Sequence, residues 1–582
     1  MNQSARCAVE NQQEQKGVHR ARQIFSAASR PTGNAAGYYF EHYVTVGKNR
    51  NVEDHYRRSP ATVSKTSLPT PATCFPYRHL SQSMLYTALN IDRRFSSRTV
   101  NIARRRPRLC FIGCALFFMT FTSVLATKAQ SVNVRISVVS LAPPRVRIEA
   151  EHGNGTKVWS FRNAYAGIIG LGERIENLSL FDARGAEVAV RKLAPGEYEA
   201  ARDATKALYE LKLDPPRGTN ETAHVSWLTA SRGILMPGDL LPLPLARAKL
   251  SLTLPEHWKV ATLETRNSGG QYEIESVESS IFFIGADLRL AQNRVRGMDV
   301  MFATAGEWAF ADADIVTVIR DVIERHERAA GVVPRGRALV LLAPFPQVSD
   351  AARWSAETRG GTVVFLSGRA TSRAAGLARL SVPLAHELFH LWVPNALALS
   401  GDYDWFYEGF TVYQAMRVSV ELGYLTFQDY LDSLARAYDI YLAERERDDL
   451  SLLEASARRW GASGALIYQK GMLIAALYDL SVRQQSRGKR SLDDVYRLLF
   501  REHRTSGDRR EGNAATMAAL NSVSGGVEFS KRYIERAHRL DLTNALDAFG
   551  LQLEKSGART RITVRNSPSR AQRDLLRQMG YN

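Results

Sequence analysis

Residues 383–413 read PLAHELFHLWVPNALALSGDYDWFYEGFTVY, and the interpretation of the chain depends on them. His386 and His390 are four residues apart, Glu387 follows the first histidine, and Glu408 follows the second after seventeen intervening residues. Most histidines on helices are structural or solvated. The stretch therefore contains either a metal site or two amphipathic helices that carry histidines.

Helical geometry favours the metal site. Residues four apart lie on one helix face with Cβ atoms about 6 Å apart, so His386 and His390 can direct both imidazoles at one ion. Glu387 then lies beside the ion and not on it. Zinc lowers the pKa of a bound water to about 7, and a neighbouring carboxylate can take its proton. The rest of this helix is apolar, so burying these three side chains would be costly without a metal or other partners.

A hydrolytic zinc site also needs a third protein ligand and one open position. Glu408, in WFYEGFTVY, is the best candidate for that ligand. We expect Pro394 to end the first helix, the Ser-Gly-Asp run at 400–402 to form a turn, and Asp404 to cap a second helix. The second helix would run antiparallel to the first and return Glu408 to the histidines.

The positive charge of the chain is concentrated near its beginning. The formal net charge is +18, but residues 1–108 hold 18 Lys and Arg against 6 Asp and Glu. Residues 109–582 are only mildly basic, so the charge gives no reason to expect a nucleic-acid partner. All four cysteines precede residue 127, so a metal in the rest of the chain must use His, Asp or Glu.

An export signal accounts for this partition. Four arginines within 104–108 precede an apolar run at 109–126, and we therefore predict a signal peptide or signal-anchor at 104–129. If it is not cleaved, the run could anchor the protein in a membrane. Residues 1–103 are polar and aperiodic, which predicts a disordered segment or a mis-assigned leader upstream of the true start. The body of the protein is then expected to be periplasmic or extracellular.

Short alternating segments predict an antiparallel β-sandwich over residues 131–285. Turn-forming stretches such as HGNG (152–155), PGE, PPRG and NSGG separate them. The segments are VNVRISVV, RVRIEAEH, TKVWSF, AEVAVRKL, ALYELKL, AHVSWL, AKLSLTL and QYEIESV.

The pattern then changes to mixed α/β over residues 286–423 and to a helical bundle over residues 424–556. Strand-like MDVMFA, ALVLLA and GTVVFL accompany a helix expected from about Asp312 to Ala330. Thr426 and the sequence SLDD at 491–494 are predicted helix starts. Residues 557–582 are basic and polar, and we expect a loosely held tail there.

The motifs resemble those of a known group of enzymes. HELFHLW and WFYEGFTVY resemble the gluzincin metallopeptidases, most of all the glycyl aminopeptidase family and secondly the aminopeptidase-N and leukotriene-hydrolase group. The similarity extends over roughly 285–555, where ALIYQKGMLIAALYDL resembles the Y-x-K-G helix of both groups. The resemblance implies one Zn2+ ion and a thermolysin-like catalytic domain. The expected fold class is therefore multidomain α+β: an N-terminal antiparallel β-sandwich, this catalytic domain and a C-terminal helical bundle.

The resemblance also implies roles for two further residues. Tyr468 would donate a hydrogen bond to the oxyanion, a role that suits a phenol because it stays neutral at pH 7. The alternative is a core tyrosine on an amphipathic helix. WSAETRGGTVVFL resembles the segment in which a strand edge aligns the substrate and a glutamate binds its free amino group. Glu357 matches that glutamate, and a solvated loop glutamate is the alternative.

The sequence therefore predicts an exported zinc peptidase that removes an amino-terminal residue from peptides. Endopeptidase activity and a catalytically silent peptide-binding relative are the alternatives. In the favoured interpretation, the zinc ligands are His386, His390 and Glu408, the general base is Glu387, and the oxyanion donor is Tyr468.

Overall fold

The computed structural model describes residues 131–459, 464–504, 509–557 and 559–581. The segments at 1–103 and 104–129 lie outside the described residues, so the leader and the export signal remain predictions. No helix in the described ranges is long and apolar enough to cross a membrane.

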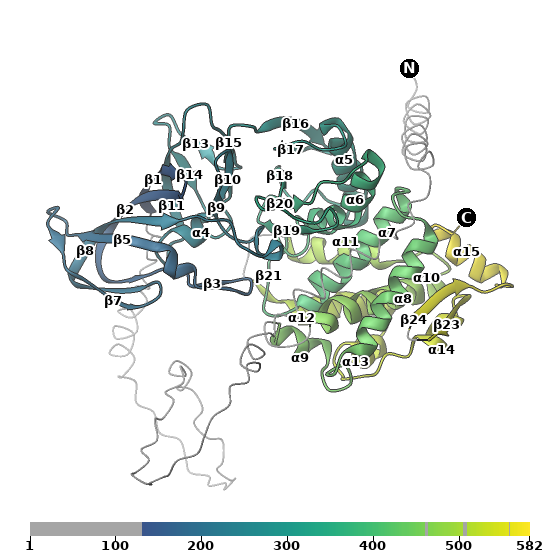
Figure 1. Cartoon of the computed structure of the whole chain (residues 1–582). Helices are drawn as coiled ribbons and strands as arrows, with labels where there is room; N and C mark the ends of the chain where they lie inside the picture. The colour runs from purple at the N-terminus through teal and green to yellow at the C-terminus, as the bar shows by residue number, and fades with distance from the viewer. Residues whose placement is uncertain (1–130, 460–463, 505–508, 558, 582) are drawn as a thin grey trace, which may run out of the picture. The chain divides into compact units, whose positions relative to one another are not determined.

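The predicted β-sandwich is present and consists of a nine-stranded and a four-stranded sheet (Figure 1). The strands of the large sheet are β1 (Ser131–Leu141), β2 (Pro144–Ser160), β5 (Ile175–Phe181), β6 (Glu187–Val188), β7 (Val190–Ala194), β8 (Glu197–Lys212), β11 (Arg247–Thr253), β13 (Thr265–Arg266) and β14 (Tyr272–Ile274). They follow the order β13-β14-β11-β1-β2-β8-β5-β6, with β7 paired to β8. One pair departs from the antiparallel pattern, because β1 runs parallel to β11.

The four-stranded sheet covers the large one. It comprises β9 (Trp227–Leu228), β10 (Arg232–Leu235), β12 (Lys259–Ala261) and β15 (Phe282–Gly285). Its order is β12-β15-β10-β9. Side chains from both sheets share one apolar core, to which the large sheet contributes Ile148 and Leu250 and the small one Leu235 and Ile284. A short hairpin of β3 (Ala164–Tyr165) and β4 (Ile168–Ile169) and the turn helix α4 (Pro237–Leu240) complete this region.

Two of the predicted sandwich boundaries are wrong. HGNG at 152–155 does not end a strand, because β2 continues through it and the pairing with β8 shifts register between Glu151 and Thr156. A β-bulge of this kind absorbs residues that otherwise signal a turn. AHVSWL is mostly not a strand, and only Trp227 and Leu228 pair with β10.

A mixed five-stranded sheet forms the centre of the second region. Its strands are β16 (Arg289–Val295), β17 (Met298–Thr304), β18 (Arg337–Pro344), β19 (Trp354–Arg359) and β20 (Thr362–Ser367), in the order β16-β17-β18-β20-β19. The three inner strands are parallel and both edge strands are antiparallel. Helices α5 (Asp312–Ala330) and α6 (Arg373–Phe389) accompany this sheet (Figure 1), and the predicted bounds of α5 are confirmed.

Alternation along the inner strands buries both faces of this sheet. Val340 and Leu342 of β18 belong to the core shared with α5 and α6, whereas Leu339 and Leu341 belong to the core shared with the four-stranded sheet. Successive side chains of a strand point to opposite faces, so a strand buried on both sides is a continuous apolar run. The edge strand β19 lies beside α6.

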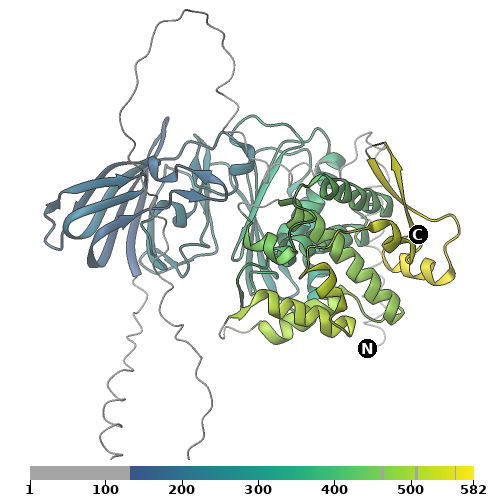
Figure 2. The ribbon, with the colours of Figure 1, turned by 90° about the horizontal axis from the view of Figure 1, so that it is seen from below.

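The remaining chain is mostly helical, and Figure 2 shows these green to yellow helices packed side by side. The helices are α7 (Thr411–Glu421), α8 (Phe427–Ala443), α9 (Leu452–Ala457), α10 (Gly471–Ser486), α11 (Leu492–His503), α12 (Gly512–Ser524), α13 (Glu528–Tyr533) and α14 (Leu542–Asp547). The predicted starts are confirmed, since Thr426 and Ser491 each cap the following helix.

The last residues do not form a loosely held tail, so that prediction is wrong. The strands β23 (Leu551–Ser556) and β24 (Arg559–Val564) form a hairpin, and α15 (Arg570–Gln578) follows it. Leu576 is buried, and the ring of Tyr581 lies against Phe427 of α8. Ile562, Leu575 and Met579 of this basic segment are also buried, and composition alone does not show that.

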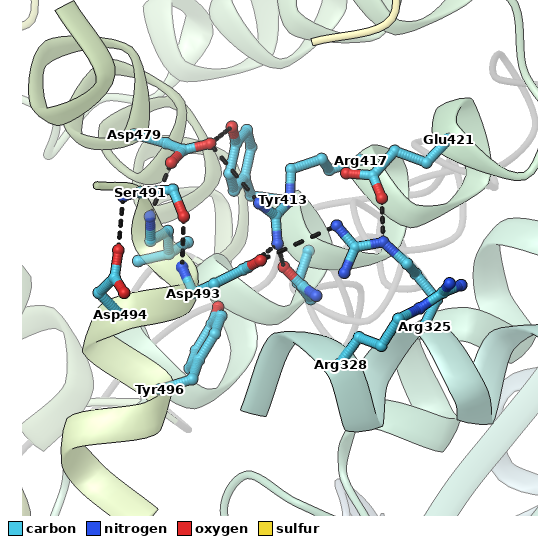
Figure 3. Close-up of polar contacts among 12 residues, drawn as sticks. Arg325, Arg328, Tyr413, Arg417, Glu421, Asp479, Ser491, Asp493, Asp494 and Tyr496 are labelled. Carbon is cyan, nitrogen blue, oxygen red and sulfur yellow. Dashed lines mark hydrogen bonds and ion pairs between the residues drawn. The ribbon is translucent and has the colours of Figure 1, made fainter. Parts of the chain in front are cut away.

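A buried ionic network joins several of these helices (Figure 3). Arg417 of α7 is buried and forms ion pairs with Asp493 of α11 and, at 3.9 Å, with Asp479 of α10. Arg325 of α5 pairs with Glu421 of α7 and, at 3.8 Å, with Asp493. Pairing offsets part of the cost that each buried charge incurs on leaving water, and loss of one partner would leave the other uncompensated. The described chain is thus multidomain α+β, with an N-terminal β-sheet region, a mixed sheet with helices and a C-terminal helical part.

Candidate metal centre

The first half of the candidate site lies at the end of α6. His386 and Glu387 belong to the last turn of α6, and His390 is its C-cap residue. All three side chains are buried and their ligand atoms lie within 4.8 Å of one another. The Nε2 atoms of the two histidines are 3.0 Å apart. His390 Nδ1 is 2.8 Å from the carbonyl oxygen of Val393, which favours a hydrogen on Nδ1 and leaves the Nε2 lone pair for a ligand.

Glu408 arrives from a π-helical segment, η4 (Trp405–Phe410), which continues into α7. Its Oε2 lies 3.4 Å from Nε2 of His386 and 3.5 Å from Nε2 of His390. The predicted role of Asp404 as a helix cap is wrong, because its side chain accepts hydrogen bonds from Tyr407 and Arg459 instead. π-helical turns inside helices are frequent at functional sites, and this one carries the third donor of the group.

Two glycines allow a second π-helical segment to approach the first. Tyr468 lies in η5 (Leu466–Lys470), directly before α10. A Cβ atom on Gly409 would lie 2.6 Å from the carbonyl oxygen of Ile467 and 2.7 Å from Cα of Gly471. The E-G and Y-x-K-G motifs therefore meet at their glycines, because no larger residue fits there.

The donor set fits a zinc ion. Zinc bonds of about 2.0–2.1 Å in a tetrahedron place ligand atoms roughly 3.3 Å apart. The three separations among His386 Nε2, His390 Nε2 and Glu408 Oε2 are 3.0, 3.4 and 3.5 Å. A carboxylate oxygen and two imidazole nitrogens at these distances match the ligand types and geometry of a catalytic zinc site.

The charges of the group also favour a bound cation. Three carboxylates lie buried together, those of Glu387, Asp404 and Glu408, and Arg459 contributes one compensating positive charge. When both imidazoles are neutral, as ligands to a metal must be, three ionised carboxylates and one guanidinium leave two negative charges in a buried place. A divalent cation would balance them, and uncompensated buried charge is costly.

The pKa values describe the group without an ion. Burial would raise the pKa of Glu408, but the positive charge of Arg459 and hydrogen bonds from both histidines hold it well below its usual range. Burial would lower the pKa of His390, yet the hydrogen bond to Glu408 raises it to about 8. Burial and the neighbouring His390 lower the pKa of His386. Glu408 is thus an anion ready to bind a cation, with one competing proton on His390.

The edge strand β19 orients Glu387. The hydroxyl of Thr358 is 2.8 Å from Oε2 of Glu387 and 2.9 Å from its backbone carbonyl oxygen. Both oxygens are acceptors and the hydroxyl has a single hydrogen, so Thr358 holds the carboxylate beside the ligand set when it donates that hydrogen to Oε2. Sequence reasoning missed Thr358, which lies 29 residues from Glu387 and belongs to no spacing pattern.

Arg459 connects Glu408 with Tyr468, and no motif or spacing in the sequence points to it. Its Nη2 lies 2.9 Å from Oε1 of Glu408 and 3.3 Å from the hydroxyl of Tyr468. Burial and the carboxylate of Glu408 raise the pKa of Tyr468, so the phenol stays a neutral donor. Arg459 is one of many arginines, and only the folded chain shows which of them reaches this site.

Glu357 lies on β19, one residue before Thr358. Its carboxylate is 2.5 Å from the Tyr165 hydroxyl, 2.7 Å from Nδ1 of His224 and 2.7 Å from Nε of Arg359. Burial would raise the pKa of Glu357, but Arg359 and His224 lower it to about 2. Tyr165 and His224 belong to the N-terminal β-sheet region, so this partly buried carboxylate joins that region to the edge of the mixed sheet. Amino-group binding by Glu357 stays a prediction.

Comparison with known proteins gives the fold. No protein-family model and no curated protein matches the sequence. Among solved structures, an aminopeptidase N family protein from Idiomarina loihiensis has a TM-score of 0.63 and 19% identity, covering 73% of this chain and 79% of that one. The chain has the fold of this aminopeptidase N family protein. An M1 zinc metallopeptidase from Deinococcus radiodurans has a TM-score of 0.44 and 14% identity, covering 71% of this chain and 95% of that one. A variant of the Deinococcus enzyme bound to the substrate Tyr-Ser-Ala has a TM-score of 0.45 and 13% identity, covering 71% and 95%.

Proposed function

We propose that the chain is a zinc-dependent peptidase and, more specifically, an aminopeptidase. The observation that carries this proposal is the convergence of His386 Nε2, His390 Nε2 and Glu408 Oε2 at separations of 3.0 to 3.5 Å. Glu387, which follows His386 in α6, completes the constellation. The aminopeptidase N fold supports the same reading.

Each residue has a distinct chemical role in this proposal. Bound zinc would polarise the substrate carbonyl and lower the pKa of water. Glu387 accepts the proton of the attacking water and later delivers it to the leaving amine. Thr358 keeps the carboxylate of Glu387 in place. Tyr468 donates its phenol hydrogen to the oxygen that becomes negatively charged. One such donor lowers the activation free energy of related reactions by about 2.7–4 kcal/mol.

A digest of mixed peptides with the zinc-loaded protein tests the activity. Mass spectrometry should show products shortened by one amino-terminal residue at a time, and amino-blocked copies of the same peptides should resist. Internal cuts in both sets of peptides would overturn the aminopeptidase proposal in favour of an endopeptidase. Absence of any cleavage by a zinc-loaded protein would favour a silent peptide-binding relative.

Endopeptidase action is the second candidate because of the environment of Glu357. Recognition of a substrate ammonium needs an available negative charge, but Arg359 and His224 already contact this carboxylate. Glu357→Gln removes the charge and keeps the size of the side chain. If Glu357 binds the amino group, this change raises KM for free peptides and spares blocked ones, with Tyr165→Phe as the matched control. Equal effects on both peptide classes would contradict amino-group binding.

The proposal also includes export through residues 104–129. The cluster of arginines before an apolar run at 109–126 supports it. Cell fractionation with amino-terminal sequencing of the mature protein tests this point. Protein found in the cytoplasm with residues 104–129 retained would contradict export.

A further inference from the structure

Arg459 follows α9 and its guanidinium contacts four side chains of the candidate site. Nη2 lies 2.9 Å from Oε1 of Glu408 and 3.3 Å from the Tyr468 hydroxyl. Nη1 lies 2.7 Å from the Tyr407 hydroxyl and also donates to Oδ1 of Asp404. Each Nη atom of arginine carries two hydrogens, so one hydrogen is available for each of these four contacts.

These contacts divide the two oxygens of Glu408 between different partners. Oε1 accepts from Arg459, whereas Oε2 faces Nε2 of both histidines. A carboxylate held in this way offers a metal one oxygen in a fixed direction. Partners of this kind behind a metal ligand orient it, and their loss typically weakens metal binding or activity about 10–100-fold.

The other half of the guanidinium is itself held firmly. Asp404 and the Tyr407 hydroxyl both contact Nη1, and the Tyr407 hydroxyl is 2.5 Å from Oδ1 of Asp404. These hydrogen bonds join η4 to the segment after α9. The planar fork of arginine therefore has little freedom to turn away from Glu408.

Arg459 also determines the direction in which Tyr468 donates. A phenol oxygen that accepts a hydrogen bond from a cation keeps its own hydrogen as the donor to another acceptor. Arginine has no acceptor atom, so the Tyr468 hydrogen cannot point at Arg459. An oxyanion donor needs this orientation before the negative charge develops.

We propose that Arg459 is a positioning residue that couples the two halves of the site: it fixes Glu408 as a one-oxygen metal ligand and directs the Tyr468 hydroxyl toward the reacting carbonyl. This inference rests on the proposed function. A purely structural role is the alternative, in which Arg459 only stabilises the fold by joining η4 to the segment after α9.

The test compares the full-length protein with Arg459→Lys and Arg459→Gln. Lysine keeps the charge but has three donors for four acceptors, and glutamine removes the charge. Arg458→Lys is the matched control, because Arg458 is the exposed neighbour at the C-cap of α9. Circular dichroism and thermal unfolding establish that each variant is folded. The zinc dissociation constant is measured by competition with a chelator, and kcat and KM on a small peptide substrate.

We expect Arg459→Lys to weaken zinc binding and, with saturating zinc, to lower kcat, each about 10–100-fold, while KM changes little. Arg459→Gln should lose more of both, and Arg458→Lys should resemble the wild type. If Arg459 had only a structural role, Arg459→Lys would lower the temperature of thermal unfolding without lowering kcat selectively over KM. Zinc affinity and kcat of Arg459→Lys equal to those of Arg458→Lys would overturn the proposal.

Tyr468→Phe provides a second, independent readout. If Arg459 acts partly through the phenol, Arg459→Lys should cost much less in kcat when Tyr468 has already been replaced, because coupled residues are not additive. If the effects of Arg459→Lys and Tyr468→Phe on kcat were fully additive, Arg459 would not act through Tyr468. The zinc dissociation constant tests separately whether Arg459 fixes Glu408. A wild-type protein that binds zinc but cleaves no peptide would contradict the proposed function and leave the zinc measurement as the test of Arg459.

Discussion

The Thr358 hydroxyl is close enough to Glu387 to hold the carboxylate in the position from which it can accept a proton. Thr358→Val keeps the shape of the side chain and removes that hydrogen bond. We expect kcat/KM for peptide hydrolysis to fall about tenfold, with zinc affinity unchanged, because Glu387 is the proposed base and not one of the proposed zinc ligands. Steady-state kinetics and chelator competition measure both quantities. A variant that loses zinc affinity and activity in parallel would contradict this role.

The pKa of His390 gives zinc binding a defined pH dependence. His390 is protonated below a pKa of about 8 in the metal-free protein, and a ligand must give up this proton. Glu408 stays ionised because its pKa is held well below its usual range. Zinc affinity should therefore fall about tenfold for each pH unit below about 8 and level off above it. Titrations with a chelator between about pH 6 and pH 9 check this, and a constant affinity would refute it.

Some residues of this candidate site could be predicted from the sequence, and others could not. His386, Glu387, His390 and Glu408 could be predicted because helical spacing alone brings the first three together and an E-G motif signals the fourth. Arg459 and Thr358 could not be predicted, since each reaches the site only through tertiary packing. No periodicity in one sequence distinguishes them from the other arginines and threonines.

At the level of helices, the contact between η4 and η5 decides whether Glu408 and Tyr468 can share one site. Gly409→Ala would place a Cβ atom 2.6 Å from the carbonyl oxygen of Ile467, and backbone cannot move aside at low cost. We expect a loss of about 1–3 kcal/mol in the free energy of unfolding together with weaker zinc binding. Denaturant unfolding and zinc titration are the measurements.

Gly336→Ala is the matched control for this change. A Cβ atom at Gly336 meets nothing within 4 Å, and this glycine does not have a positive φ. It should leave both stability and zinc affinity close to those of the wild type. If Gly409→Ala behaved like Gly336→Ala, the glycine contact would not be what sets the distance between the two segments.

Strands and helices with strong periodicity were predictable, as α5 and the inner strands of the mixed sheet show. Elements that depend on neighbours were not. The strand β2 passes through HGNG because a bulge in its pairing with β8 accommodates those residues. The helix α15 exists because Leu575 and Leu576 find a buried place, although the segment is basic and polar.

On the scale of the whole molecule, the network around Arg417 joins α7, α10 and α11 (Figure 3). Arg417→Met would leave Asp479 and Asp493 buried with one positive partner fewer. We expect a loss of about 3–5 kcal/mol in the free energy of unfolding, because removing one member leaves uncompensated charge. Denaturant unfolding measures this quantity.

The exposed pair of Arg497 and Asp494 on α11 supplies the comparison for that network. Its ions are 3.0 Å apart, but the Arg497 side chain is 47% exposed. Arg497→Met should therefore cost less than about 1 kcal/mol. Equal losses for both variants would show that the buried network does not carry the stability assigned to it.

We propose that the chain binds one zinc ion and uses Glu387 to activate water. The most direct measurement is the zinc content of the purified protein, by elemental mass spectrometry, paired with peptide hydrolysis by the wild type and Glu387→Gln. Under this proposal we expect about one zinc per chain in both proteins and a loss of about 10²–10⁴ in kcat in the variant. A wild-type protein that binds no zinc, or a Glu387→Gln variant that hydrolyses peptides as fast as the wild type, would contradict it.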